Sequence, residues 1–328
     1  MRHPSTFPAP KLALALALAS GLSAQELRRG INDADVVVVA RQIGKTRHDD
    51  RLDLHRLQII HRVRGGAEET AVTVLDWPKL SVHLRPSPRQ SRLYCLRDAS
   101  GIATRLELPS DRGPYFKMVG WPGSNPLIGA DVEHDPIVQF AAILARGVAG
   151  AAAVETAGEL TALTVEGAPS VRTEATRLLA ERGDLRASIA APQWSRIVAR
   201  ASGETEDVPY KIALAQLCAE QRLTGLVDTL AVSLGPVQDP EYARAVGRIA
   251  KVLHGENATE VLERRLQHLR DPKDRAVVLR AIGATNTQAA LTYLLRLDGL
   301  TGADAAVEAA LREHRSPRAK EAVLRRQK

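Results

Sequence analysis

The pattern of hydrophobic and polar positions divides the chain into a strand-rich first part and a helical second part. A short helix over 25–31 is followed by brief β-branched and apolar runs that have the length of strands. They predict strands over 34–40, 52–63, 71–75, 92–96 and 102–108, the last two joined as a hairpin across residues 98–101. Five short strands suit a small barrel, which the Gly- and Pro-rich segment 109–136 would close as irregular structure.

The second part repeats one helix-start signal. Asp followed by Pro at Asp135, Asp239 and Asp271 places a capping carboxylate before a proline whose missing N–H costs nothing in the first turn. The last two signals stand 32 residues apart, and three apolar columns follow the same period. The columns are Ala213, Ala245, Val277 and Ala309; Leu214, Val246, Val278 and Ala310; and Leu230, Leu262 and Leu294.

Two helices fit each 32-residue unit. Such a period indicates a stack of helix pairs, because one pair cannot bury its apolar stripe alone. A helical bundle without repeats is the alternative, since helical spacing does not fix how helices stack. An irregular earlier copy, with Val171, Ala175, Leu178-Leu179 and Gly183-Asp184, resembles a short HEAT-type repeat. That resemblance spans residues 168–328 and implies an extended binding surface.

A second resemblance lies in the strand-rich part. The run 34–39, the strand ending at Arg64-Gly65-Gly66, and residues 93–96 and 102–108 resemble the netrin-like OB barrel shared with tissue inhibitors of metalloproteases. The resemblance covers residues 26–110. Those inhibitors chelate the protease zinc with an N-terminal cysteine, whereas this chain is expected to begin at Gln25 after processing. The resemblance to the barrel therefore implies no protease inhibition.

These patterns predict an α+β two-domain protein, a small N-terminal OB-like β-barrel followed by an α-helical HEAT-like solenoid. Residues 1–24 are interpreted as a signal peptide, 25–130 as the barrel with its closing segment, 131–167 as connecting helices and 168–328 as the repeats. Arg2 and Lys11 precede the apolar run 12–22, and the small residues Ser23 and Ala24 suit cleavage. The run is shorter than the ~20 residues that span a bilayer. We therefore expect export to the periplasm or the extracellular space and no transmembrane segment; an uncleaved anchor is the alternative.

Composition limits the partners. Without residues 1–24, the formal net charge falls from +7 to +5, which is only mildly basic. Nucleic-acid binding would need a dense basic stripe and stacking aromatics, but aromatics make up 3% of the chain. The two cysteines, Cys95 and Cys218, fall in apolar runs of different domains and are interpreted as buried free thiols rather than a disulfide or nucleophiles.

Several chemical motifs are incomplete. Gly44-Lys45-Thr46 imitates the end of a phosphate-binding loop, but Val39 stands where the first glycine belongs, so we expect an ordinary loop after a strand. Ser124, His134 and Asp135 are close in sequence, which is poor support for a catalytic triad. We predict no catalytic residues, no cofactor and no metal ligands.

Histidines of the barrel offer the other chemistry. They are His48, beside Asp49 and Asp50, and His55, His61 and His83. Imidazoles with carboxylates bind zinc. His55 and His61 would share one face of a strand but stand about 20 Å apart, so a metal site would need His48 or His83 as well.

The C-terminal segment is basic. It holds Arg312, His314, Arg315, Arg318, Lys320, Arg325, Arg326 and Lys328. We interpret it as the polar end cap that a solenoid needs, with contact to an anionic surface as the alternative. The sequence as a whole predicts an exported, non-catalytic interaction module or scaffold that binds a protein partner through its repeats. The alternative is an envelope hydrolase or metal-binding protein that uses residues of the N-terminal domain.

Overall fold

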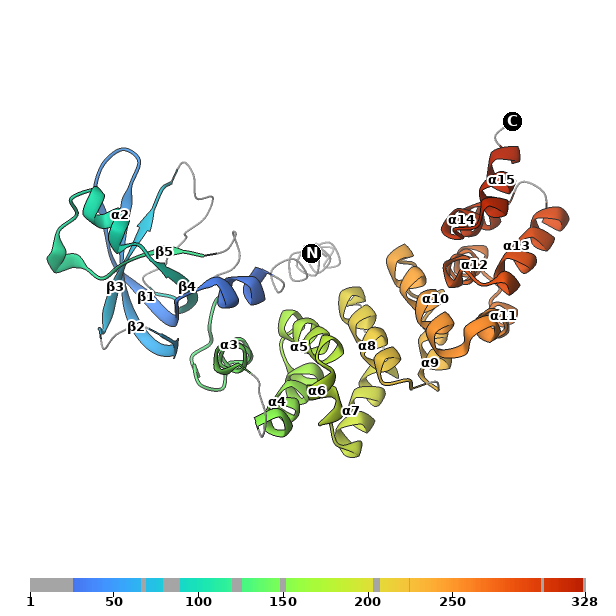
Figure 1. Cartoon of the computed structure of the whole chain (residues 1–328), viewed down its shortest axis with the longest axis horizontal. Helices are drawn as coiled ribbons and strands as arrows, with labels where there is room; N and C mark the ends of the chain where they lie inside the picture. Colours follow the sequence, from blue (N-terminus) through green and yellow to red (C-terminus); the bar gives the residue numbers. More distant parts are fainter. Residues whose placement is uncertain are drawn as a thin grey trace, which may run out of the picture. The chain divides into compact units, whose positions relative to one another are not determined.

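The computed structural model describes residues 26–65, 69–78, 89–119, 126–147, 152–202, 207–223, 225–301 and 304–326. The predicted signal peptide, residues 1–24, lies outside them. The chain divides into two compact units between Ala175 and Thr176. A closed five-stranded barrel comes first and helices follow, so the expected α+β two-domain class is confirmed (Figure 1).

The barrel begins after a helix of residues 26–33. Its strands are β1 (Val36–Arg47), β2 (Asp53–Arg64), β3 (Ala71–Asp76), β4 (Arg92–Asp98) and β5 (Tyr115–Met118). They follow the order β1-β2-β3-β5-β4, and β4 pairs with β1 to close the barrel. All neighbours are antiparallel except β3 and β5, which are parallel.

Alternation along the strands separates two apolar clusters. Leu57 and Val74 belong to a cluster to which all five strands contribute, and this cluster fills the barrel interior. Leu54 and Leu75, on the opposite faces of the same two strands, pack with Ala99 and Ala103 under helix α2 (Ser100–Arg105). Odd-numbered residues of β2 and even-numbered residues of β3 therefore face the inside of the barrel.

Two sequence-based expectations for the barrel were wrong. Residues 100–105 form helix α2 instead of the second arm of a hairpin, because the buried positions Ala99 and Ala103 recur at a four-residue spacing that fits a helix over β3. The fifth strand is β5, which lies in the segment expected to be irregular. Its pairing with β3 and β4 is long-range, so local composition did not indicate it.

Three helices lie between the barrel strands and the start of the second unit, the third of them crossing the unit boundary. They are α3 (Pro136–Arg146), α4 (Ala152–Glu166) and α5 (Pro169–Glu181), and the unit boundary falls within α5. Asp135 caps α3 as expected, accepting a hydrogen bond from the Ile137 backbone N–H at 2.9 Å. Helix α3 packs against β2 and α4.

In the described residues of the second unit, the elements that follow are helices and a short 3-10 turn, Gly255–Asn257. The helices are α6 (Gly183–Ala187), α7 (Ala191–Ser202), α8 (Val208–Glu220), α9 (Leu226–Val232), α10 (Pro240–His254), α11 (Ala258–Gln267), α12 (Pro272–Thr285), α13 (Gln288–Thr301), α14 (Ala305–Glu313) and α15 (Pro317–Arg326). Helices α8, α10, α12 and α14 contact one another in succession and form one layer. Contacts of α9 with α11 and of α13 with α15 form a second layer.

The 32-residue register is visible in the packing. All four members of the Leu214 column are fully buried in the first layer, and Leu230, Leu262 and Leu294 are buried in the second. Each first-layer helix also begins with a capping aspartate, at Asp207, Asp239, Asp271 and Asp304. Among the described residues, no helix is both long enough and apolar enough to cross a membrane.

Candidate functional site

A cluster of three ionisable side chains lies inside the barrel, where strand β2 begins and strand β3 ends. Asp53 and His55 are two residues apart on β2 and so project from the same face. Asp76 ends β3 directly opposite Asp53 in the strand register. Since Leu57 and Val74 continue the same faces into the barrel core, the three polar side chains extend the interior toward its rim.

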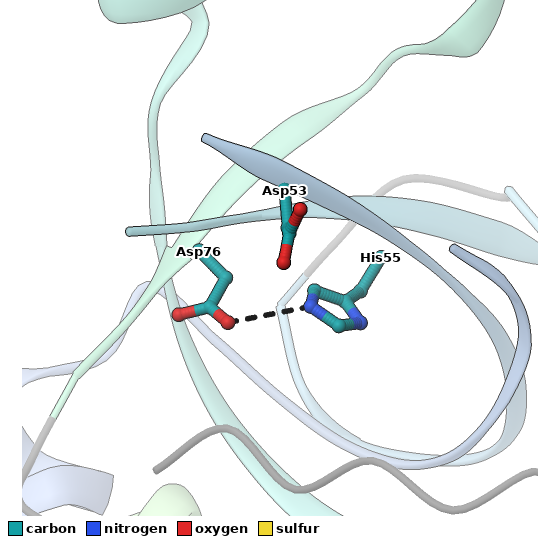
Figure 2. Close-up of side chains that lie close together, drawn as sticks. All are labelled: Asp53, His55 and Asp76. Atoms are coloured by element: carbon teal, nitrogen blue, oxygen red, sulfur yellow. Dashed lines mark ion pairs between the residues drawn. The ribbon is translucent and has the colours of Figure 1, made fainter. Parts of the chain in front are cut away.

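The three side chains are buried and converge. Their exposed fractions are 6% for Asp53, 3% for His55 and 6% for Asp76. One potential ligand atom from each lies within 4.8 Å of the others. Figure 2 shows the two carboxylates and the imidazole directed toward one space, with His55 Nε2 3.3 Å from Asp76 Oδ2. Despite this distance, Nε2 makes no hydrogen bond.

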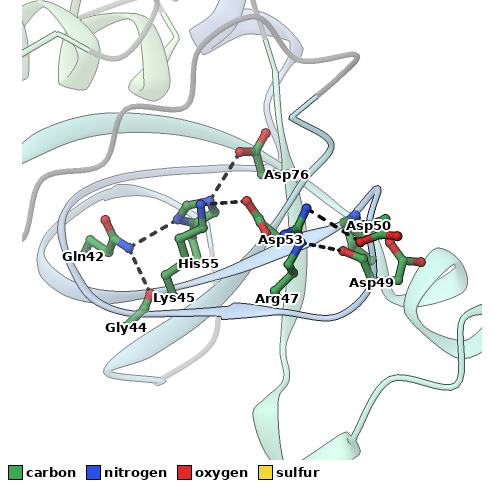
Figure 3. A network of polar contacts seen from close by, with 10 residues as sticks. Gln42, Gly44, Lys45, Arg47, Asp49, Asp50, Asp53, His55 and Asp76 are labelled. Carbon is green, nitrogen blue, oxygen red and sulfur yellow. Dashed lines mark hydrogen bonds and ion pairs between the residues drawn. The ribbon is translucent and has the colours of Figure 1, made fainter.

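Two residues of β1 also contact the cluster (Figure 3). The Lys45 ammonium pairs with Asp53 Oδ2 at 2.7 Å, although half of the lysine side chain is exposed. The Gln42 amide nitrogen lies 3.3 Å from His55 Nδ1 and 3.2 Å from the Gly44 carbonyl oxygen. Gln42 thus orients the imidazole, leaving Nε2 toward the carboxylates.

Two other barrel histidines that the structure describes, His48 and His61, are not brought to this cluster. His48 is exposed in the turn after β1. Asp49 closes that turn by accepting the Arg51 and Leu52 backbone N–H groups, which lower the pKa of its carboxyl. His61 lines a separate cavity of about 420 Å³ between β2, α3 and α4. His83 lies outside the described residues.

Of the two histidines expected to join His55 in a metal site, His48 is described and lies away from the cluster, and the requirement itself remains a prediction. The neighbours of His55 are Asp53 and Asp76, which were not among the ligands expected from the sequence. The available signal was the Asp-x-His spacing on a predicted strand, with another aspartate at the end of the next strand.

Gly44-Lys45-Thr46 was expected to be a loop, and that expectation was wrong. All three residues belong to β1 and pair with β2, and they form an extended strand because β1 continues beyond its apolar run to the hairpin turn. An extended ladder directs its N–H groups to the neighbouring strand rather than around a phosphate. Lys45 instead forms an ion pair with the Asp53 carboxylate.

The triad considered in the sequence is not assembled among its described members. His134 Nδ1 lies 3.0 Å from Asp131 Oδ1, and this exposed pair raises the pKa of His134. Asp135 accepts hydrogen bonds from the Gly129 and Ile137 N–H groups, so it caps α3. Ser124 lies outside the described residues.

Both cysteines are free and buried, as expected. Burial raises the pKa of each thiol to about 12, which leaves almost no thiolate near neutral pH. Neither side chain suits nucleophilic chemistry in the folded protein.

The helical unit has a cationic groove where successive turns meet. It measures about 620 Å³ and lies between the last turn of α10, the α12–α13 turn and the α14–α15 turn. Arg248, Lys251 and Arg315 are among its lining residues, and none of the lining residues that the structure describes carries a carboxylate. We call this the basic groove.

The turns that line the basic groove are fixed by polar contacts to neighbouring backbone. His314 Nδ1 accepts the Ser316 backbone N–H at 3.2 Å, so its Nε2–H donates to the Thr287 carbonyl at 3.1 Å. Asn286 adopts the left-handed conformation with φ 52°, and its side-chain oxygen accepts the Arg315 N–H at 2.6 Å. The groove is thus lined by ordered backbone.

Part of the basic C-terminal segment is structural. Arg326 pairs with Asp298, Arg312 pairs with Glu308, and His314 is buried. Arg318 and Lys320 remain exposed on α15, whereas Lys328 lies outside the described residues. The end cap and the contact with an anionic surface both remain predictions for these exposed residues.

Comparisons with known protein families, with curated protein sequences and with solved structures found no match.

Proposed function

We propose that the protein is an exported, non-catalytic interaction module that binds an acidic segment of a protein partner in the basic groove. The single observation behind this proposal is the charge of that groove, whose described lining residues include three cationic side chains and no carboxylate. An acidic segment complements such a surface in charge, which speeds association and favours the right partner.

The layered packing of the second unit supports the same proposal. Helix pairs that repeat at 32 residues expose equivalent turns side by side, as HEAT-type solenoids do. We infer the HEAT-like identity of the stack, and the OB-like identity of the barrel, from the repeat and from the strand order. Both identities, like export through residues 1–24, belong to the proposal.

Charge reversal in the groove tests the proposal. The mature chain and the double variant Arg248→Glu/Arg315→Glu are immobilised and exposed to cell-envelope fractions. The Arg318→Glu/Lys320→Glu variant is the matched control, because it makes the same change in net charge at exposed positions of α15 that do not line the groove.

We expect one partner to be retained by the unchanged protein and by the control variant, lost from the groove variant, and released as salt rises. Retention of nothing beyond blank beads would contradict the proposal. Equal loss from both variants would instead indicate a general charge effect of the C-terminal segment.

A further inference from the structure

We propose that Asp53, His55 and Asp76 form a binding site for one divalent transition-metal ion of the zinc class. This inference is independent of the interaction proposed for the helical unit. It depends on the convergence of three potential ligands inside the barrel and on the buried His55 nitrogen that lacks a hydrogen bond.

The geometry is close to that of a three-ligand site. Ligand atoms bound to one zinc ion at about 2.0–2.2 Å lie roughly 3.3–3.6 Å from each other in a tetrahedral arrangement. The three candidate atoms already lie within 4.8 Å of one another. Small side-chain rotations would therefore bring them to ligand distance without moving the strands, and a fourth position would remain for water.

Burial makes the unsatisfied nitrogen significant. A buried polar atom without a partner costs about 1–3 kcal/mol, and most such atoms in proteins are satisfied. His55 Nε2 is enclosed with its ring 3% exposed, faces Asp76 Oδ2 at 3.3 Å and has no hydrogen bond. A metal ion between the three side chains would accept the lone pair of Nε2 and bind an oxygen of each carboxylate.

The donor set selects the class of ion. Two carboxylates and a neutral imidazole suit zinc and its transition-metal neighbours, whereas Mg²⁺ and Ca²⁺ prefer oxygen ligands alone. The two carboxylates also balance the charge of a divalent ion. In the present orientation the Gln42 amide nitrogen donates to His55 Nδ1 and to the Gly44 carbonyl oxygen. Ligation through Nε2 needs the ring proton on Nδ1, so the amide has to turn its oxygen toward the ring and give up the Gly44 hydrogen bond when a metal binds.

Lys45 competes with the metal. Its ammonium pairs with Asp53 at 2.7 Å and would have to leave when a cation binds that carboxylate. The lysine side chain is 52% exposed, so it can move into solvent without losing a buried position. Removing the ammonium should therefore strengthen metal binding, whereas a site that is only an ion-pair network would bind no metal in either form.

The experiment uses the full mature chain, stripped of metal with a chelator and titrated with Zn²⁺ by calorimetry. We expect one equivalent to bind, with affinity lowered about tenfold or more in Asp76→Asn and in His55→Gln. Lys45→Gln should raise the affinity. His134→Gln is the matched control, because His134 also contacts an aspartate but on the surface, and its affinity should be unchanged.

Cobalt provides a readout that does not depend on affinity. Co²⁺ in the site of the unchanged protein should give the visible absorption of a low-coordinate centre, and Zn²⁺ should abolish it. Circular dichroism of each variant shows whether it remains folded. If Asp76→Asn or His55→Gln fails to fold, Lys45→Gln and the cobalt spectrum decide the question.

Three outcomes would overturn the proposal. They are the absence of saturable Zn²⁺ binding, binding that Asp76→Asn and His55→Gln leave unchanged while both stay folded, and binding that is lost only with His134→Gln. The last result would place the ion at the exposed Asp131–His134 pair.

Discussion

Alanine at Gly283 is expected to destabilise the helical unit, although alanine is the better helix former. Gly283 lies within α12, where that helix approaches α14. A Cβ added there would lie 2.1 Å from the Ala310 carbonyl oxygen and 2.9 Å from its carbon. These are backbone atoms, so the contact is relieved only if the two helices move apart.

Two opposing terms set the magnitude. Forcing an additional carbon into a packed interface costs about 1–3 kcal/mol, and a backbone contact belongs near the upper end. Replacing glycine by alanine inside a helix stabilises the folded state by roughly 1 kcal/mol. The net loss for Gly283→Ala is therefore about 2 kcal/mol, or a fall in Tm of roughly 4–8 °C for a unit of this size.

Gly299→Ala is the matched control. Gly299 lies within α13 of the same unit, is exposed, and has no atom within 4 Å of the added Cβ. Only the helix-propensity term applies there, so its Tm should rise by roughly 2–4 °C. Thermal melts of the full chain followed by circular dichroism at 222 nm measure both changes. Equal shifts in the same direction would refute the close approach of α12 and α14.

Three further outcomes are expected. Burial raises the pKa of the Cys95 and Cys218 thiols to about 12, so neither thiol should react with a maleimide at pH 8 until the protein is unfolded. Rapid labelling of the native protein would contradict their burial. The NMR-measured pKa of His134, raised by its Asp131 partner, should fall in Asp131→Asn and with added salt. Because the folded pKa is the higher one, the pair stabilises below the unfolded pKa, and its small contribution disappears as pH rises through the folded pKa. Leu262→Ala should lower the free energy of unfolding by about 2–5 kcal/mol in a denaturant titration, and a near-neutral result would contradict the buried column.

The sequence indicated the helical stack through local signals. A capping aspartate and the apolar positions that follow it act within a few turns of one helix, so they can be read without a structure. The 32-residue columns from Leu214 to Ala310 are buried as the period required. Strands β1 to β4 were also predictable, since each contains an apolar or alternating run of strand length.

The fifth strand could not be read in the same way. Tyr115–Met118 is short and lies among Gly and Pro residues, and it becomes a strand because β3 and β4 supply its hydrogen-bond partners. Residues 100–105 show the reverse case, where an apolar run suited a strand but the surface beside β3 accepts a helix. In both cases, contacts with segments far away in the chain decided the secondary structure.

The candidate metal site depended on tertiary structure still more. The spacing of Asp53 and His55 on one strand was visible in the sequence, and so was an aspartate at position 76. Their convergence was not, because it requires the strand register that sets Asp76 opposite Asp53 and the barrel closure that buries all three. Sequence periodicity determined which residues share a face of an element. Only the folded barrel decided which faces meet, because that pairing joins segments far apart in the chain.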